Sequence, residues 1–204
     1  MHLLDQQILG IAILVLLGIL VTVKRVATGS ILDKPEGNLL VQSVNIFNLL
    51  FLLVVNPLAA ILLITSGLVT MDPTHLTIYD QRILMITEIV GLGMYVTGFI
   101  LMAASLITLG RNYQLGGSTP RSEDTMVMKG PYRLLRHPMY TAALSISVGL
   151  TCLIQSWAAC CVFLTYLVLI MLLVPIEESK LRQAYGQQYV TYQLKSRRLV
   201  PFVY

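Results

Sequence analysis

The residues best suited to chemistry gather in one short stretch, KGPYRLLRHPMYTA, which runs from residue 129 to 142. We call it the reactive stretch. Pro138 suits the first turn of a helix, where no backbone N–H is needed, and this places His137 at the helix start. The free N–H groups and the positive dipole end of a helix favour an anion there. Tyr140 follows His137 by three residues, so both side chains can face one pocket. The stretch therefore predicts a ligand pocket at this helix start.

The three cations of the stretch, Lys129, Arg133 and Arg136, have a simpler explanation. Basic side chains beside an apolar span usually hold lipid head groups, and we predict mainly that role for them. Interfacial tyrosines are also common membrane anchors. His137 is harder to explain in this way, because it is one of only three histidines and directly precedes an apolar span.

Two adjacent acids, Glu177 and Glu178, follow the last apolar span. Glu178 can pair with Arg182 four residues later, which would only support a helix. Glu177 has Lys180 as its one nearby cation, and a carboxylate at membrane depth without an obvious partner indicates a functional role. It could hold a cationic ligand group or accept a proton. Glu88, near the start of an earlier span, has no second feature beside it, and we predict that it is structural.

The composition shows what kind of chain must position these residues. Of its 204 residues, 56% are hydrophobic and 12% are charged, about half the charged fraction of a soluble domain. We therefore predict an all-α integral membrane protein with a single domain over residues 1–204. The three cysteines lie inside apolar runs, so neither a disulfide framework nor a metal site is expected. The net charge of +4 accompanies no nucleic-acid motif.

Apolar runs of about 20 residues can cross a bilayer, and three of them precede the reactive stretch. We predict these spans at residues 8–23, extended by a turn at either end, at 44–69 with a kink at Pro57, and at 83–109. The third span contains three glycines that predict close contact with a neighbouring helix, namely Gly91, Gly93 and Gly98.

The run from residue 139 to 175 is too long for one span. Gln155 and Ser156 interrupt it with polar side chains, which predicts a helix hairpin whose first arm is short, about 17 residues. The chain then has five transmembrane helices. A hairpin that dips into the membrane and returns as one unit would give four.

The charges and the tail indicate which side of the membrane holds the pocket. With five spans, Arg82 is the only one of the 14 lysines and arginines that falls on the far side, which predicts a cytoplasmic basic face and an outside N-terminus. After the last span, Leu181, Tyr185, Tyr189 and Tyr192 recur at helical spacing. We predict an amphipathic C-terminal helix that lies at the cytoplasmic interface and presents these residues on one face.

Three segments now match a known family. GPYRLLRHPMY resembles the G-x-Y-x-x-x-R-H-P-x-Y signature of the integral-membrane methyltransferases, which include isoprenylcysteine carboxyl methyltransferase and the phospholipid N-methyltransferases. EESKLRQAYGQQYVTYQLKSRRLVP resembles their second signature, E-E-x-x-L-x-x-x-[FY]-G-x-x-Y-x-x-Y followed by an arginine and a final proline. LGRNY, at 109–113, is similar to the segment after the third span of short prokaryotic members. The resemblance covers residues 105–202, whereas residues 1–104 match only as apolar spans.

The resemblance implies S-adenosylmethionine as methyl donor, with S-adenosylhomocysteine as product. Carried over residue by residue, it implies a cofactor pocket made of Asp124, Thr125, Met126, Val127, Tyr132, His137, Pro138, Met139, Tyr140 and Glu177. Glu177 is also the candidate catalytic residue. These types suit the donor, because a helix start suits a carboxylate, an acid suits an ammonium or a hydroxyl, and tyrosine faces suit a sulfonium.

One position departs from the family pattern. The carboxyl methyltransferases place an arginine four residues before the first glutamate, where this chain has Leu173. A prenylcysteine carboxylate, a lipid amine or a thiol therefore all stay open as the lipophilic, membrane-embedded acceptor. The short form suggests a prokaryotic plasma membrane, and the oligomeric state is open.

Two other functions compete with methyl transfer. Sterol reductases carry a similar C-terminal half that binds NADPH, but they are usually much longer, with more spans. A lipid-binding scaffold without catalysis would use the basic face only to hold anionic head groups. It would tolerate replacement of His137 or Tyr132.

Overall fold

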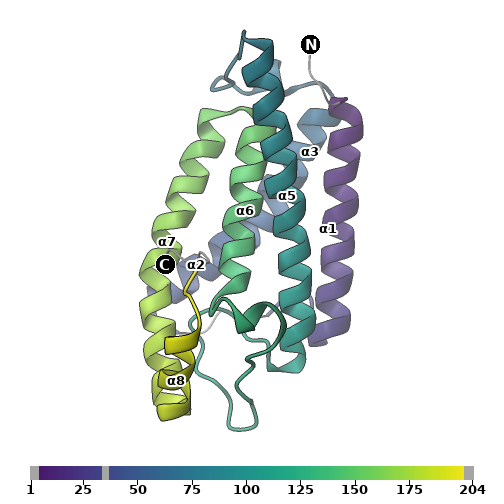
Figure 1. Cartoon of the computed structure of the whole chain (residues 1–204). Helices are drawn as coiled ribbons and strands as arrows, with labels where there is room; N and C mark the ends of the chain where they lie inside the picture. The colour runs from purple at the N-terminus through teal and green to yellow at the C-terminus, as the bar shows by residue number, and fades with distance from the viewer. Residues whose placement is uncertain (1–4, 34–36, 200–204) are drawn as a thin grey trace.

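The computed structural model describes residues 5–33 and 37–199, which form a helical bundle with the reactive stretch at one end (Figure 1). Lys34 of the basic face and Pro201 of the second signature lie outside these ranges. The helices are α1 Gln6–Thr28, α2 Leu39–Leu50, the π-helix η1 Phe51–Val55, α3 Asn56–Ile64, α4 Leu68–Met71, α5 Gln81–Leu109, the 3₁₀-helices η2 Gly110–Asn112 and η3 Gly130–Arg133, α6 Pro138–Ile154, α7 Trp157–Tyr185 and α8 Gln187–Lys195.

The helical membrane architecture is confirmed. Among the described residues, four stretches are long and apolar enough to cross a bilayer, namely Gln6–Thr28, Leu39–Ile64, Gln81–Asn112 and Trp157–Tyr185. The predicted short arm of the hairpin is α6, which has 17 residues. It falls below the length of an ordinary span, so a count of five spans stays a prediction.

The irregularity at Pro57 takes the form of a π-helical turn. The segment Phe51–Val55 has π geometry and joins α2 to α3 without a break in the helix. Proline cannot donate to the helical ladder, and the polar side chain beside it forms hydrogen bonds within the helix and to α5. The Asn56 amide donates to the Phe51 carbonyl at 2.8 Å, and its oxygen accepts from the Tyr95 hydroxyl of α5 at 2.8 Å.

Glycines bring α5 and α6 close together. A Cβ on Gly91 would lie 2.8 Å from the Cβ of Cys152, and one on Gly98 would lie 2.9 Å from the Ala142 carbonyl. The prediction of close contact is therefore confirmed for these two glycines. It is wrong for Gly93, which faces open space because it lies on a different side of the helix.

The hairpin turns where the sequence predicted. Gln155 ends α6 in the left-handed region, with φ +51°, and the Ser156 side chain accepts from the Ala159 N–H at the start of α7. The segment before α5 holds this turn, since Leu76 N donates to the Gln155 carbonyl at 2.6 Å. The turn lies at the end of the bundle opposite the reactive stretch (Figure 1).

The C-terminal part differs from the prediction. α7 continues through Pro175 to Tyr185, and Gly186, with φ +55°, ends it and starts α8 (Figure 1). The prediction of a single helical face from residue 181 to 192 is therefore wrong, because the glycine turns the chain between Tyr185 and Tyr189. Tyr189 and Tyr192 are buried, so their side chains pack against the protein and do not present an exposed face.

Candidate active site

A cavity of about 330 Å³ lies inside the end of the bundle that carries the reactive stretch. All but one of the predicted cofactor residues line it: Asp124, Thr125, Met126, Val127, Tyr132, His137, Met139, Tyr140 and Glu177. The exception is Pro138, which is buried and begins α6. Four residues of the tail line the cavity as well, namely Leu181, Tyr185, Tyr189 and Tyr192. The volume is within the range of small-molecule sites.

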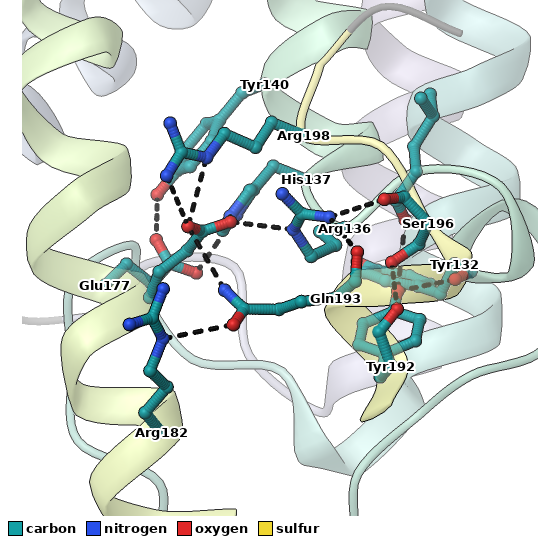
Figure 2. A network of polar contacts seen from close by, with 12 residues as sticks. Tyr132, Arg136, His137, Tyr140, Glu177, Arg182, Tyr192, Gln193, Ser196 and Arg198 are labelled. Atoms are coloured by element: carbon teal, nitrogen blue, oxygen red, sulfur yellow. Dashed lines mark hydrogen bonds and ion pairs between the residues drawn. The ribbon is translucent and has the colours of Figure 1, made fainter. Parts of the chain in front are cut away.

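Glu177 forms one wall and is held from two sides. Its Oε2 accepts a hydrogen bond of 2.6 Å from the Tyr140 hydroxyl and one of 3.2 Å from the Gly117 N–H. Figure 2 shows the Tyr140 contact bridging the two arms of the hairpin. Two donors on one oxygen fix the carboxylate and leave Oε1 toward His137, at 3.7 Å from Nδ1.

The turn at Gly116 and Gly117 closes the cavity beside Glu177 and was not among the predicted site residues. A Cβ on Gly116 would overlap the Tyr140 hydroxyl, and Gly117 has φ +75°, so both positions favour glycine. Lys180 donates to the Gly117 carbonyl at 2.6 Å, and Asn45 of α2 donates to the Gly116 carbonyl at 3.0 Å. A glycine pair between two helices is a turn signal that could have pointed to this segment.

His137 lies at the start of α6, as predicted, but its main-chain N–H is occupied. That N–H donates to the Arg198 carbonyl at 3.1 Å, because the tail runs alongside the segment before α6. The imidazole is buried between two carboxylates, 3.7 Å from Glu177 and 3.6 Å from Glu178, and stacks on the ring of Tyr140. Burial lowers the pKa of His137, but the two carboxylates outweigh it and raise the pKa above the ordinary value of 6.5.

Glu178 is the centre of a buried ion-pair network, and its predicted pairing with Arg182 is wrong. It accepts from Arg136 Nε at 2.7 Å and lies 3.0 Å from Arg198 Nη2. Arg182 instead donates to the side-chain oxygen of Gln193 at 3.0 Å. The tertiary structure brings arginines from two other segments to the carboxylate, so the local partner is displaced.

Arg136 is therefore not mainly a head-group ligand. Besides Glu178, it binds the carbonyls of Gln193 at 3.1 Å and Ser196 at 2.5 Å. Its own N–H donates to the Arg197 carbonyl at 2.6 Å. These contacts join the reactive stretch to the tail. Lys129 and Arg133, by contrast, are exposed on the protein surface, and head-group binding stays a prediction for them.

The loop between α5 and η3 supplies the wall at 124–127. Asp124 accepts from the Arg121 N–H at 2.9 Å and from the Gln114 side chain. Burial raises the pKa of Asp124, but these contacts with Arg121 and Gln114 hold it below its ordinary value. Asn112 donates to Thr125 at 3.3 Å. The loop is thus folded back on itself and positions 124–127 against the cavity.

Residues 1–104 also contribute to the cavity, which the sequence did not indicate. Lys24 of α1, Asp33 of the following loop and Asn45 of α2 line it together with Tyr113, which lies in the LGRNY segment. Leu173 is fully buried and is not among the lining residues; a Cβ on Gly116 would lie 3.2 Å from it. The side chain at 173 therefore does not reach the ligand space.

Comparison with known proteins shows which family the chain belongs to. A model of the phospholipid methyltransferase family matches residues 86–188. The chain belongs to this family. It is 33% identical to protein-S-isoprenylcysteine O-methyltransferase B of Arabidopsis thaliana over 115 residues, which make up 55% of this chain and 58% of that protein. It is 28% identical to a probable protein-S-isoprenylcysteine O-methyltransferase of Oryza sativa subsp. indica over 116 residues, 56% of this chain and 61% of that protein. The chain thus spans less than two thirds of these relatives.

A solved structure shows the same fold. The eukaryotic intramembrane Ras methyltransferase, isoprenylcysteine carboxyl methyltransferase, superposes with a TM-score of 0.53 at 19% identity. The superposition covers 92% of this chain and 74% of the other. The phospholipid methyltransferase family match includes the reactive stretch, Gly116, Gly117, Glu177 and Glu178, but not Lys24 or Asp33.

Proposed function

We propose that the chain transfers a methyl group from S-adenosylmethionine to a lipophilic acceptor in the membrane. One observation carries the proposal: a single cavity joins a polar wall to an apolar arm. His137, Tyr140 and Glu177 form the polar wall. The apolar arm continues between the spans and is lined by Leu20, Leu49, Leu52, Leu53, Met102 and Leu106. The two ends match a polar donor and a lipid acceptor.

The polar wall fits the donor by its chemistry. Glu177 can hold an ammonium or a hydroxyl, and the rings of Tyr132 and Tyr140 can face a sulfonium. One buried polar atom of a residue that lines the cavity, Tyr189 Oη, has no hydrogen-bond partner among the described residues. Such an atom is free to bind a ligand. When bound, the donor supplies an electrophilic methyl group on its sulfonium, which an acceptor lone pair takes up as a neutral thioether leaves.

The chain itself contributes positioning and exclusion of water. The Gly116–Gly117 turn and the tail cover the polar end, while the apolar arm receives the acceptor chain. An amine or thiol acceptor must also lose a proton, and Glu177 is the carboxylate that could accept it.

The names of the relatives, isoprenylcysteine O-methyltransferases, support a prenylcysteine carboxylate as one acceptor. On the charge distribution we place the site at the cytoplasmic face, with the N-terminus outside. On the short form of the chain we place it in a prokaryotic plasma membrane.

Calorimetric titration of the purified chain with S-adenosylhomocysteine tests the donor site. We expect saturable binding that is lost in Glu177→Ala and His137→Ala and kept in Tyr79→Ala, a tyrosine that is 92% exposed outside the cavity. The proposal would be overturned if the unmodified chain did not bind S-adenosylhomocysteine. It would also be overturned if NADPH, rather than S-adenosylmethionine, competed for the site. A radiolabelled donor incubated with total lipid extract and prenylcysteine analogues would then show which product carries the methyl group.

A further inference from the structure

A partly buried cation, Lys24, lines the cavity and is far along the sequence from the family signatures. Lys24, in the last turns of α1, donates from Nζ to Asp33 Oδ2 at 2.7 Å and to the Ile31 carbonyl at 2.8 Å. Its ammonium lies 5.1 Å from the centre of the Tyr113 ring. The Lys24 side chain is 17% exposed and that of Asp33 30% exposed. The lysine is thus partly buried, and its partner is more exposed.

Tyr113 connects this pair with the donor wall. Burial raises the pKa of the Tyr113 phenol, and the carboxylates of Asp33 and Glu177 raise it further. Tyr113, Asp33 and Glu177 all line the same cavity, although the two carboxylates come from distant parts of the chain. Lys24 belongs to α1 and Glu177 to α7.

The apolar arm leads along α1 to Lys24. Leu20 and Val21 line the arm, and they precede Lys24 by four and three residues. Residues at these spacings lie on one face of a helix. An acceptor chain that packs against Leu20 and Val21 therefore brings its head group to the ammonium of Lys24.

The other cations of the cavity wall are already committed. Within the described part of the chain, the basic residues that line the cavity are Lys24, Arg136 and His137. Arg136 is held by Glu178 and by the carbonyls of Gln193 and Ser196. His137 lies between Glu177 and Glu178. Lys24 differs from them because the one carboxylate on it, Asp33, belongs to a loop and has a second partner, Ser30, whose hydroxyl donates at 2.5 Å.

We propose that Lys24 determines acceptor specificity by binding an anionic head group in place of Asp33. The inference rests on the proposed function and narrows its acceptor to a lipid that carries a carboxylate or a phosphate beside the transferring site. Asp33 then acts as an internal substitute for the ligand and keeps Lys24 paired until the acceptor arrives. An acceptor carboxylate has no proton to lose, so this chemistry needs no base.

Acceptor binding without any methyl donor tests the proposal. The purified chain in detergent is titrated with three farnesyl lipids: N-acetyl-S-farnesylcysteine, its neutral methyl ester, and farnesyl phosphate. We expect one or both anions to bind at least about tenfold more tightly than the ester, the effect of a charge-assisted contact of about 1.4 kcal/mol. Lys24→Met should reduce anion binding to the level of the ester, and Lys24→Arg should retain most of it. Lys195→Met, an exposed lysine of α8 outside the cavity, is the matched control and should change nothing.

A second variant separates specificity from folding. Asp33→Asn removes the competing carboxylate and should tighten anion binding, which a damaged fold could not do. Equal binding of anions and ester, unchanged anion binding in Lys24→Met, or weaker anion binding in Asp33→Asn would overturn the proposal. Unchanged binding of S-adenosylhomocysteine to the Lys24→Met variant would show that the donor site is intact. A result against Lys24 thus leaves the proposed function standing, whereas loss of S-adenosylhomocysteine binding in the unmodified chain would remove the proposed function itself.

Discussion

The Tyr140 hydroxyl and the Glu177 carboxylate form a hydrogen bond of 2.6 Å between residues that lie 37 positions apart. Tyr140 belongs to the first turn of α6, and Glu177 to the last third of α7. The contact therefore fixes the open end of the helix hairpin, opposite its turn at Gln155 and Ser156. It also orients the carboxylate that faces the cavity, so fold and site depend on the same bond.

Tyr140→Phe removes this bond and keeps the ring that stacks on His137. A hydrogen bond to a charged group contributes about 1.5–3 kcal/mol. We therefore expect S-adenosylhomocysteine affinity to fall about tenfold to a hundredfold, measured by calorimetry. Tyr79→Phe, at an exposed position, should leave the affinity unchanged. Equal affinity of Tyr140→Phe and the unmodified chain would show that the bond does not orient Glu177 for binding.

Gly116→Ala places a methyl group where the Tyr140 hydroxyl lies. The tyrosine or the turn must move, and such overpacking costs about 1–3 kcal/mol. We expect a lower melting temperature and weaker S-adenosylhomocysteine binding. Gly93→Ala is the control, because that glycine faces open space and alanine favours a helix interior by about 1 kcal/mol. The prediction would be contradicted if both variants melted alike.

Glu178→Gln leaves two arginines without their carboxylate. Glu178 is 2% exposed, and removal of one partner of a buried ion pair costs about 3–5 kcal/mol. We expect a large loss in the free energy of unfolding, measured by denaturant titration in detergent. Glu123→Gln provides the comparison, because this acid is 71% exposed and lies 3.9 Å from Arg121. A surface pair contributes about 0–1 kcal/mol, so a similar loss in both variants would refute the role of the network.

His137 makes stability depend on pH. Glu177 and Glu178 face its imidazole from α7, Tyr140 stacks on it from α6, and the carboxylates raise its pKa above 6.5. A group whose pKa is raised by folding stabilises fully below its unfolded value, and this contribution is lost as the pH rises through the folded value. The melting-temperature difference between the unmodified chain and His137→Gln should therefore be largest below pH 6.5 and shrink at higher pH. A difference that stays constant with pH would indicate a neutral imidazole.

The local features of the fold were predictable because they depend on residues close together in the sequence. Apolar runs placed the spans, the polar pair Gln155 and Ser156 placed the hairpin turn, and Pro138 placed the start of α6. Nine of the residues that the family resemblance predicts for the cofactor pocket line the cavity, and their role in cofactor binding stays a prediction. The prediction of close helix contact was wrong for Gly93, because hydropathy and glycine content do not say which face of a helix meets a neighbour.

The sequence by itself thus determined a helical membrane protein with its reactive residues at one end, since hydrophobic periodicity and charge are properties of local segments. Only the tertiary structure decided which partners these residues take. Glu178 binds Arg136 and Arg198 in place of Arg182, and Lys24 enters the cavity although it precedes the signatures by about a hundred residues. The physical reason is that a buried charge takes whichever partner folding brings within a few ångströms, and sequence distance does not limit that choice.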